Sequence, residues 1–206
     1  MPDYINYING TWEKASQSSI PINDAGFLLG DGLFETIRFD NQKIFQLNKH
    51  LERLHASLTV IHIHLEASNA EIGELLDKII QKNELQSGLL RLMVTRGNVK
   101  GPPWKYKGPA SIYINIRPLS PKPDLPVNVV FYSETKYPII RYTPAIKSLN
   151  YLGNMMAKKD ADNANAFEPV FYNGNGFITE CAIRNIFFIH RNTLLTPNTN
   201  LGVLPG

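Results

Sequence analysis

A proline-rich stretch in the middle of the 206-residue chain sets the firmest limit on its fold. Residues 118–126 read PLSPKPDLP and contain four prolines. Proline lacks a backbone N–H and has a fixed φ, so this stretch cannot form a helix or the interior strand of a sheet. We therefore predict a linker at residues 120–125 between a smaller N-terminal α+β domain, residues 1–119, and a larger domain, residues 126–206.

Turn residues and apolar periodicity predict helices and strands on both sides of this linker. Asn9-Gly10 is typical of a hairpin turn, and leucines at helical spacing predict a helix over residues 46–60. Ser68 and Glu71 have the spacing of a capping box. Residues 26–45, GFLLGDGLFETIRFDNQKIF, are expected to form a strand, a bend and a strand with a turn at Asn41-Gln42, and residues 88–96 and 110–116 are expected to be strands. After the linker we expect strand 127–133, helix 147–163, strand 168–173 and strand 176–190. This alternation predicts an α/β fold with some α+β elements.

The composition excludes several classes of protein. The chain has 21 basic and 18 acidic residues, a balance too mild to indicate nucleic-acid binding. Cys181 is the only cysteine, so no intrachain disulfide can form, which is typical of a reducing compartment. We see no signal peptide and no apolar stretch long enough for a membrane helix, and therefore expect a cytoplasmic protein with no membrane partner. Because the chain stops just after a turn, we expect the larger domain to be incomplete.

Three charged residues are candidates for chemistry. Lys147 stands where a loop is expected to meet a helix, and Glu180 lies on a mainly apolar predicted strand. Arg53 lies beside the leucine stripe of helix 46–60, where its guanidinium could bind a phosphate. Each also has a plain alternative: a solvated lysine, an edge-strand acid and a surface arginine. His62 and His64 alternate as on one strand face but lack a third ligand, so we expect no metal site.

The order of six segments resembles the class IV pyridoxal phosphate enzymes, a family of branched-chain aminotransferases, D-amino acid aminotransferases and aminodeoxychorismate lyases. The segments are GDGLFETIR (30–38), HLERLHAS (50–57), LLRLMVTRG (89–97), IKSLNYLGNMMAK (146–158), ITECAIRNIFFI (178–189) and GVLPG (202–206). The resemblance implies a two-domain fold of the D-amino acid aminotransferase-like type, PLP fold type IV, with pyridoxal 5′-phosphate between the domains. It also implies a homodimer.

The resemblance implies a role for each matching residue. Lys147 would form the Schiff base and move the proton, Arg53 would hold the phosphate, and Glu180 would face the pyridine nitrogen. Further cofactor contacts are implied for Tyr151 at the ring hydroxyl, Ile183 and Asn185 in the turn beside the phosphate, and Leu204 on one ring face. The implied substrate pocket contains Phe34, Arg38, Arg91 and Arg96.

The resemblance leaves the reaction open. The leading expectation is an aminotransferase moving an amino group between an amino acid, of the branched-chain or apolar L type, and a 2-oxo acid. The segment NVKGPPWKYKG lacks the Arg-x-His pair of D-amino acid enzymes, which disfavours that role. FETIR also occurs in lyase-like members, so a lyase forming 4-aminobenzoate and pyruvate is the second candidate. A non-catalytic binding or dimerising relative is the third.

Overall fold

The computed structural model describes residues 2–123 and 126–206. Its described residues form two compact units. The first unit contains the residues up to Ser120 and the short segment Lys147–Leu149, and the second contains the residues from Pro121 to Ile146 and from Asn150 to Gly206. Residues 124 and 125, part of the expected linker, lie outside the described residues.

The first unit is built on a six-stranded antiparallel sheet of order β2-β1-β6-β5-β3-β4. The expected hairpin turn at Asn9-Gly10 is confirmed, and both residues have positive φ. The strands are β1 Ile5–Ile8, β2 Thr11–Lys14, β3 Gly32–Asp40, β4 Lys43–Ile44, β5 Ser87–Thr95 and β6 Ser111–Arg117. A 3-10 turn, η1, spans Pro103–Lys105.

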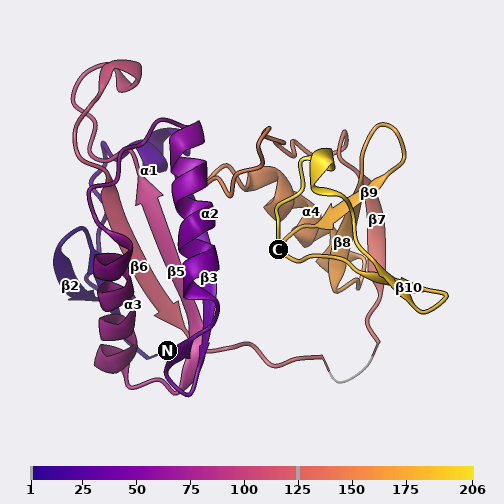
Figure 1. Ribbon diagram of the computed structural model, residues 1–206, viewed down its shortest axis with the longest axis horizontal. Coiled ribbons are helices and arrows are strands. Elements are labelled where there is room, and N and C mark those ends of the chain that lie inside the picture. Colours follow the sequence, from indigo (N-terminus) through magenta and orange to yellow (C-terminus); the bar gives the residue numbers. More distant parts are fainter. Residues whose placement is uncertain (1, 124–125) are drawn as a thin grey trace. The chain divides into compact units, whose positions relative to one another are not determined.

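Two helices cover one face of this sheet (Figure 1). Helix α2, Leu47–Val60, packs against β3, and helix α3, Asn69–Asn83, packs against β1 and β6. The capping box predicted from Ser68 and Glu71 is present at the start of α3. Alternate residues of β3 and β5 point into the core under these helices because side chains alternate across a strand. The buried core residues include Leu33, Ile37, Phe39, Leu51, Leu54, Ile72, Leu76, Leu90, Leu92 and Val94.

Two local predictions for the first unit are wrong. Residues 26–29 begin the segment expected to start as a strand, but they belong to a short helix, α1, Ala25–Leu29. Asp24 accepts a hydrogen bond from Gly26 N at its start, and Gly30 ends it in the left-handed conformation. These two caps favour a helix more strongly than the apolar residues between them favour a strand. Residues 62–64 do not form a strand either, so His62 and His64 do not share a strand face.

The second unit contains a three-stranded sheet of order β7-β8-β9. Strands β7, Val129–Ser133, and β8, Glu168–Tyr172, are parallel, and helix α4, Leu152–Asn163, lies between them in sequence and packs against both. Such a crossover helix is what a parallel pair requires. Strand β9, Ile178–Cys181, is antiparallel to β8. A hairpin of β10, Phe188–His190, and β11, Thr193–Leu195, and the 3-10 turn η2, Thr199–Leu201, follow.

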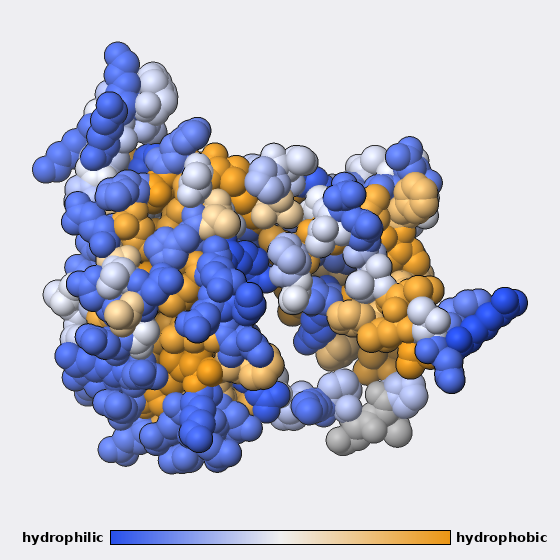
Figure 2. Space-filling model, viewed as in Figure 1, coloured by the Kyte–Doolittle hydropathy of each residue, from blue (hydrophilic) through white to orange (hydrophobic). Residues whose placement is uncertain are grey.

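Apolar side chains are exposed on both units, and Figure 2 shows them as orange areas among hydrophilic residues. In the second unit they include Phe131 on β7 and Ile189 in the β10–β11 hairpin. Within the described residues, no helix is long and apolar enough to cross a membrane.

Candidate functional site

Lys147 lies in an extended segment that pairs with β3, so the prediction that helix 147–163 begins at this residue is wrong. Phe34 N donates to Lys147 O at 2.9 Å, and Leu149 N donates to Gly32 O at 3.0 Å. The α4 helix begins only at Leu152. Gly32 permits this close pairing, since a Cβ there would lie 2.6 Å from a backbone oxygen of β5 and 2.8 Å from a side-chain atom of Leu149. A strand edge therefore holds the Lys147 backbone.

The Lys147 side chain lies with two of the residues expected near the substrate. Its Nζ is 4.6 Å from the ring centroid of Phe34, and the guanidinium carbon of Arg91 is 3.8 Å from the same centroid. Phe34 is only 2% exposed. Both contacts are of the cation–π type, in which a positive group is attracted to an aromatic ring. The structure thus brings Lys147, Phe34 and Arg91 together within the first unit.

Arg53 is fixed on the helix-covered face of the same strand. Its Nε donates to Glu35 Oε1 at 2.8 Å and its Nη2 to Glu35 Oε2 at 2.5 Å, a bidentate pair. His50 Nδ1 lies 2.8 Å from Glu35 Oε2. Burial would raise the pKa of Glu35, but its hydrogen bonds with Arg53 and His50 outweigh burial and lower that pKa. Arg53 therefore contacts Glu35 and Lys147 contacts Phe34, and these two residues are consecutive on β3.

The two other arginines expected near the substrate lie elsewhere in the first unit. Arg38 is exposed and pairs with Asp40 at 3.6 Å, four residues, or about 13 Å, along β3 from Phe34. Arg96 donates to Asp31 through Nε and Nη2 and to the carbonyls of Ile61 and His62. Four of its five N–H groups are used in these bonds, which tie the end of α2 to the loop before β3.

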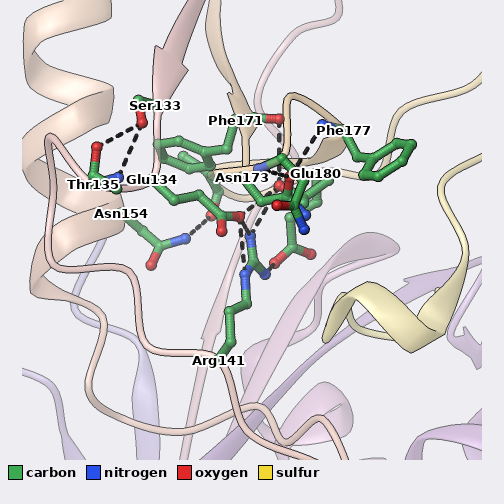
Figure 3. A network of polar contacts seen from close by, with 12 residues as sticks. Ser133, Glu134, Thr135, Arg141, Asn154, Phe171, Asn173, Phe177 and Glu180 are labelled. Carbon is green, nitrogen blue, oxygen red and sulfur yellow. Dashed lines mark hydrogen bonds and ion pairs between the residues drawn. The ribbon is translucent and has the colours of Figure 1, made fainter.

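Glu180 belongs to a charged network in the second unit (Figure 3). Arg141 Nη1 donates to Glu180 Oε1, while its Nε and Nη2 donate to Glu134 Oε1. Thr179 Oγ1 donates to the same Glu134 oxygen at 2.6 Å and lies 3.2 Å from Arg141 Nη2. Burial would lower the pKa of Arg141, but the charge of Glu180 and the hydrogen bond to Glu134 outweigh burial and raise it. Glu180 is thus a paired, largely enclosed carboxylate rather than a solvated edge acid.

The chain leaves β9 after Cys181, so the prediction of one strand over residues 176–190 is wrong. Tyr151 OH and Asn154 Nδ2 donate to Ala182 O at 2.7 and 2.9 Å, and Ile183 N donates to Glu168 Oε1 at 3.0 Å. These side chains form hydrogen bonds with Ala182 O and Ile183 N, so those backbone groups are not available to pair with a neighbouring strand. Glu168, 2% exposed, also pairs with Arg184. Because Ile183 N–H donates to the Glu168 carboxylate, it is not available to donate to a phosphate.

Asn185 and Leu204 lie in the segments that border this turn. A Cβ built on Gly206 would lie 1.6 Å from Asn185 Nδ2, so the last residue lies directly against the Asn185 side chain. Leu204 is half-buried. Gly202 approaches Arg141, since a Cβ there would be 3.3 Å from Arg141 Cβ. Cys181 is buried, and burial raises its pKa to about 11.

The sequence did not single out several members of these clusters. Arg141, Glu134 and Thr179 carry no local motif, and they meet only because β7, β9 and the segment before α4 come together. Glu35 stands in the recognised FETIR segment, which is a usable signal, whereas Glu168 gives none. No group of three His, Cys, Asp or Glu side chains that could hold a metal occurs in the part of the chain that the structure describes.

Each unit contains side chains whose chemistry suits pyridoxal phosphate. The first unit provides a primary amine at Lys147 and a pre-oriented guanidinium at Arg53. The second provides the Glu180 carboxylate, which can accept a hydrogen bond from a protonated ring nitrogen. An amine, a phosphate-binding fork and an acid are the three groups that the cofactor requires.

Comparison with known proteins gives consistent matches. The family model described as amino-transferase class IV matches residues 32–206. The D-alanine aminotransferase of Listeria monocytogenes is 31% identical over 204 residues, covering 97% of this chain and 70% of that protein. The aminodeoxychorismate lyase of Bacillus subtilis is 32% identical over 208 residues, covering 97% and 69%. The branched-chain amino acid aminotransferase of Escherichia coli shares the fold with a TM-score of 0.85 at 22% identity, covering 100% of this chain and 71% of that one.

Proposed function

The chain belongs to the class IV aminotransferases, and from this premise we propose that it is a pyridoxal-phosphate-dependent aminotransferase that uses Lys147 as its reactive amine. The observation that carries the proposal is the position of Lys147 Nζ at the buried ring of Phe34, on a backbone segment anchored to β3. The proposed reaction moves an amino group from an amino acid, of the branched-chain or apolar L type, to a 2-oxo acid.

Each residue of the proposed site has a definite task. When bound, pyridoxal phosphate supplies an electron-withdrawing ring that stabilises negative charge at the substrate α-carbon. The Lys147 amine would hold the cofactor through its aldehyde and would move the proton at the substrate α-carbon. Arg53, oriented by Glu35, holds the phosphate.

The remaining tasks are binding and orientation. Glu180 would accept a hydrogen bond from the protonated ring nitrogen. Arg91, stacked on Phe34, provides a positive charge for the substrate carboxylate. Tyr151, Ile183, Asn185 and Leu204 are proposed to line the cofactor, and Arg38 and Arg96 are the remaining substrate candidates from the sequence.

Substitution of Lys147 tests the proposal. Lys147→Ala removes the amine that binds the cofactor and moves the proton, so we expect acceptor-dependent glutamate formation to fall by about a thousandfold or more. Lys159→Ala is the control, because Lys159 is exposed on α4. Full turnover by Lys147→Ala would show that the proposed mechanism is wrong.

A lyase that forms 4-aminobenzoate and pyruvate from aminodeoxychorismate is the second candidate. The 32% identity to the B. subtilis lyase favours it. Parallel assays separate the two reactions, since pyruvate release without a 2-oxo acid acceptor supports the lyase and acceptor-dependent glutamate formation supports transamination. A non-catalytic relative would show neither product and no visible absorbance band with the cofactor.

We also propose that the protein works as a homodimer in the cytoplasm with small-molecule substrates. The family resemblance supports the dimer, and the single cysteine supports the compartment. Light scattering at working concentration measures the assembly directly, and a mass of one chain would contradict the dimer.

A further inference from the structure

The network around Arg141 contains one more negative charge than positive charge. Glu134 and Glu180 face a single guanidinium, and the three side chains are only 14%, 15% and 19% exposed for Glu134, Glu180 and Arg141. Partial enclosure strengthens the interactions between these charges, because water screens them less. A site with this excess negative charge favours a neighbouring cationic group.

The two carboxylates are not held in the same way. Glu134 Oε1 receives Arg141 Nε, Arg141 Nη2 and the Thr179 hydroxyl, so Glu134 anchors the guanidinium. Among the described residues, Glu180 is bound only by Arg141 Nη1, through Oε1, so its Oε2 lies outside the ion pair. Arg141 is therefore anchored on one side and orients a less constrained acid on the other.

Two of the residues that Arg141 contacts lie on one strand. Thr179 and Glu180 are consecutive on β9, so their side chains leave opposite faces of the strand. Arg141 nevertheless contacts both, which places its guanidinium along the edge of β9. β9 is the last strand of the described β7-β8-β9 sheet, so its outer edge has no partner strand in that sheet.

We propose that Arg141 is a positioning residue that orients the Glu180 carboxylate toward the ring nitrogen of the cofactor. This role rests on the proposed function. Arg141 keeps one Glu180 oxygen in a fixed ion pair, and the other oxygen accepts the hydrogen bond from the protonated nitrogen. Glu134 and Thr179 hold Arg141 in the geometry that makes this possible.

The experiment compares two ligands that differ at the ring nitrogen. Pyridoxal 5′-phosphate and 1-deazapyridoxal 5′-phosphate, which has carbon in place of that nitrogen, are titrated into wild-type protein and the variants Arg141→Met and Arg141→Gln. Binding is followed by visible absorbance to obtain two dissociation constants for each protein. Lys159→Met is the control, because it removes one exposed positive charge from the same unit.

We expect wild-type protein and Lys159→Met to bind the natural cofactor more tightly than the carbon analogue. In each uncharged Arg141 variant the ratio of the two dissociation constants should fall by about tenfold, while the affinity for the carbon analogue stays unchanged. Arg141→Lys, which keeps the charge but not the fork, should recover part of the preference. If Arg141 had a purely structural role, its substitution would weaken the binding of both ligands equally.

Two outcomes contradict different statements. If either folded Arg141 variant keeps the wild-type preference, Arg141 does not position Glu180, although the proposed function stands. If wild-type protein gives no absorbance band with the natural cofactor, the proposed function fails and the role of Arg141 fails with it.

Discussion

Glu35 shows how a buried charge is accommodated at the scale of a single residue. The carboxylate is 1% exposed, yet its pKa is lowered because the hydrogen bonds of Arg53 and His50 outweigh burial. An acid whose pKa is lower in the folded state than in the unfolded chain contributes stability above its unfolded pKa. That contribution is lost as the pH falls from about 4.5 through the lower folded value.

Glu35→Gln should therefore destabilise the first unit near pH 7. Neutralising Glu35 leaves the partly buried Arg53 guanidinium without its counter-charge, and we expect a loss of about 2 kcal/mol. Urea unfolding followed by tryptophan fluorescence measures it, because both tryptophans, Trp12 and Trp104, lie in the first unit.

The difference in stability between wild type and Glu35→Gln should shrink as the pH falls from about 4.5 through the lower folded pKa, because wild-type Glu35 then also becomes protonated. Glu52→Gln is the matched control, since Glu52 is 60% exposed in its pair with Lys49. A loss of stability that is equal at pH 7 and pH 3 would show that the charge of Glu35 is not its cause.

Local signals predicted some elements well and missed others for identifiable reasons. Helix α2 was predictable from its leucine stripe and helix α3 from its capping box, because both signals are local in sequence. The start of α4 was not, because Lys147–Leu149 pairs with a strand more than a hundred residues earlier. The end of β9 was missed because Tyr151, Asn154 and Glu168 capture backbone groups from distant positions.

Two glycines in regular elements should respond in opposite ways to alanine. Gly73 lies inside α3, where a Cβ would meet only Leu47 Cδ2 at 3.6 Å, so Gly73→Ala should stabilise the first unit by about 0.5–1 kcal/mol. A Cβ on Gly88 of β5 would lie 2.6 Å from Arg117 O and 2.8 Å from the Phe39 ring. Gly88→Ala should therefore cost about 2 kcal/mol.

The same urea titration measures both glycine variants. The backbone oxygen of Arg117 is held in the β5–β6 ladder, so it cannot move aside as a flexible side chain could. Equal midpoints for the two variants would contradict the packing that the structure gives these strands.

At the scale of the whole molecule, Lys147, the proposed reactive amine, belongs to a different unit from most of its sequence neighbours. Lys147–Leu149 joins the first unit, while the residues before and after it belong to the second. The proline-rich stretch gave a signal for a division near residue 120. No sequence signal indicated that Lys147–Leu149 returns to the first unit. The family could be recognised because its six segments are contiguous motifs, whereas Arg141, Glu134 and Thr179 become neighbours only through folding.

The central claim is that the Lys147 amine binds the cofactor aldehyde. The protein is incubated with pyridoxal 5′-phosphate, reduced with borohydride to make the link permanent, digested and analysed by mass spectrometry. We predict one phosphopyridoxyl adduct, on Lys147, and none on the exposed Lys159. An unmodified Lys147, whether the label falls on surface lysines or nowhere, would contradict the account.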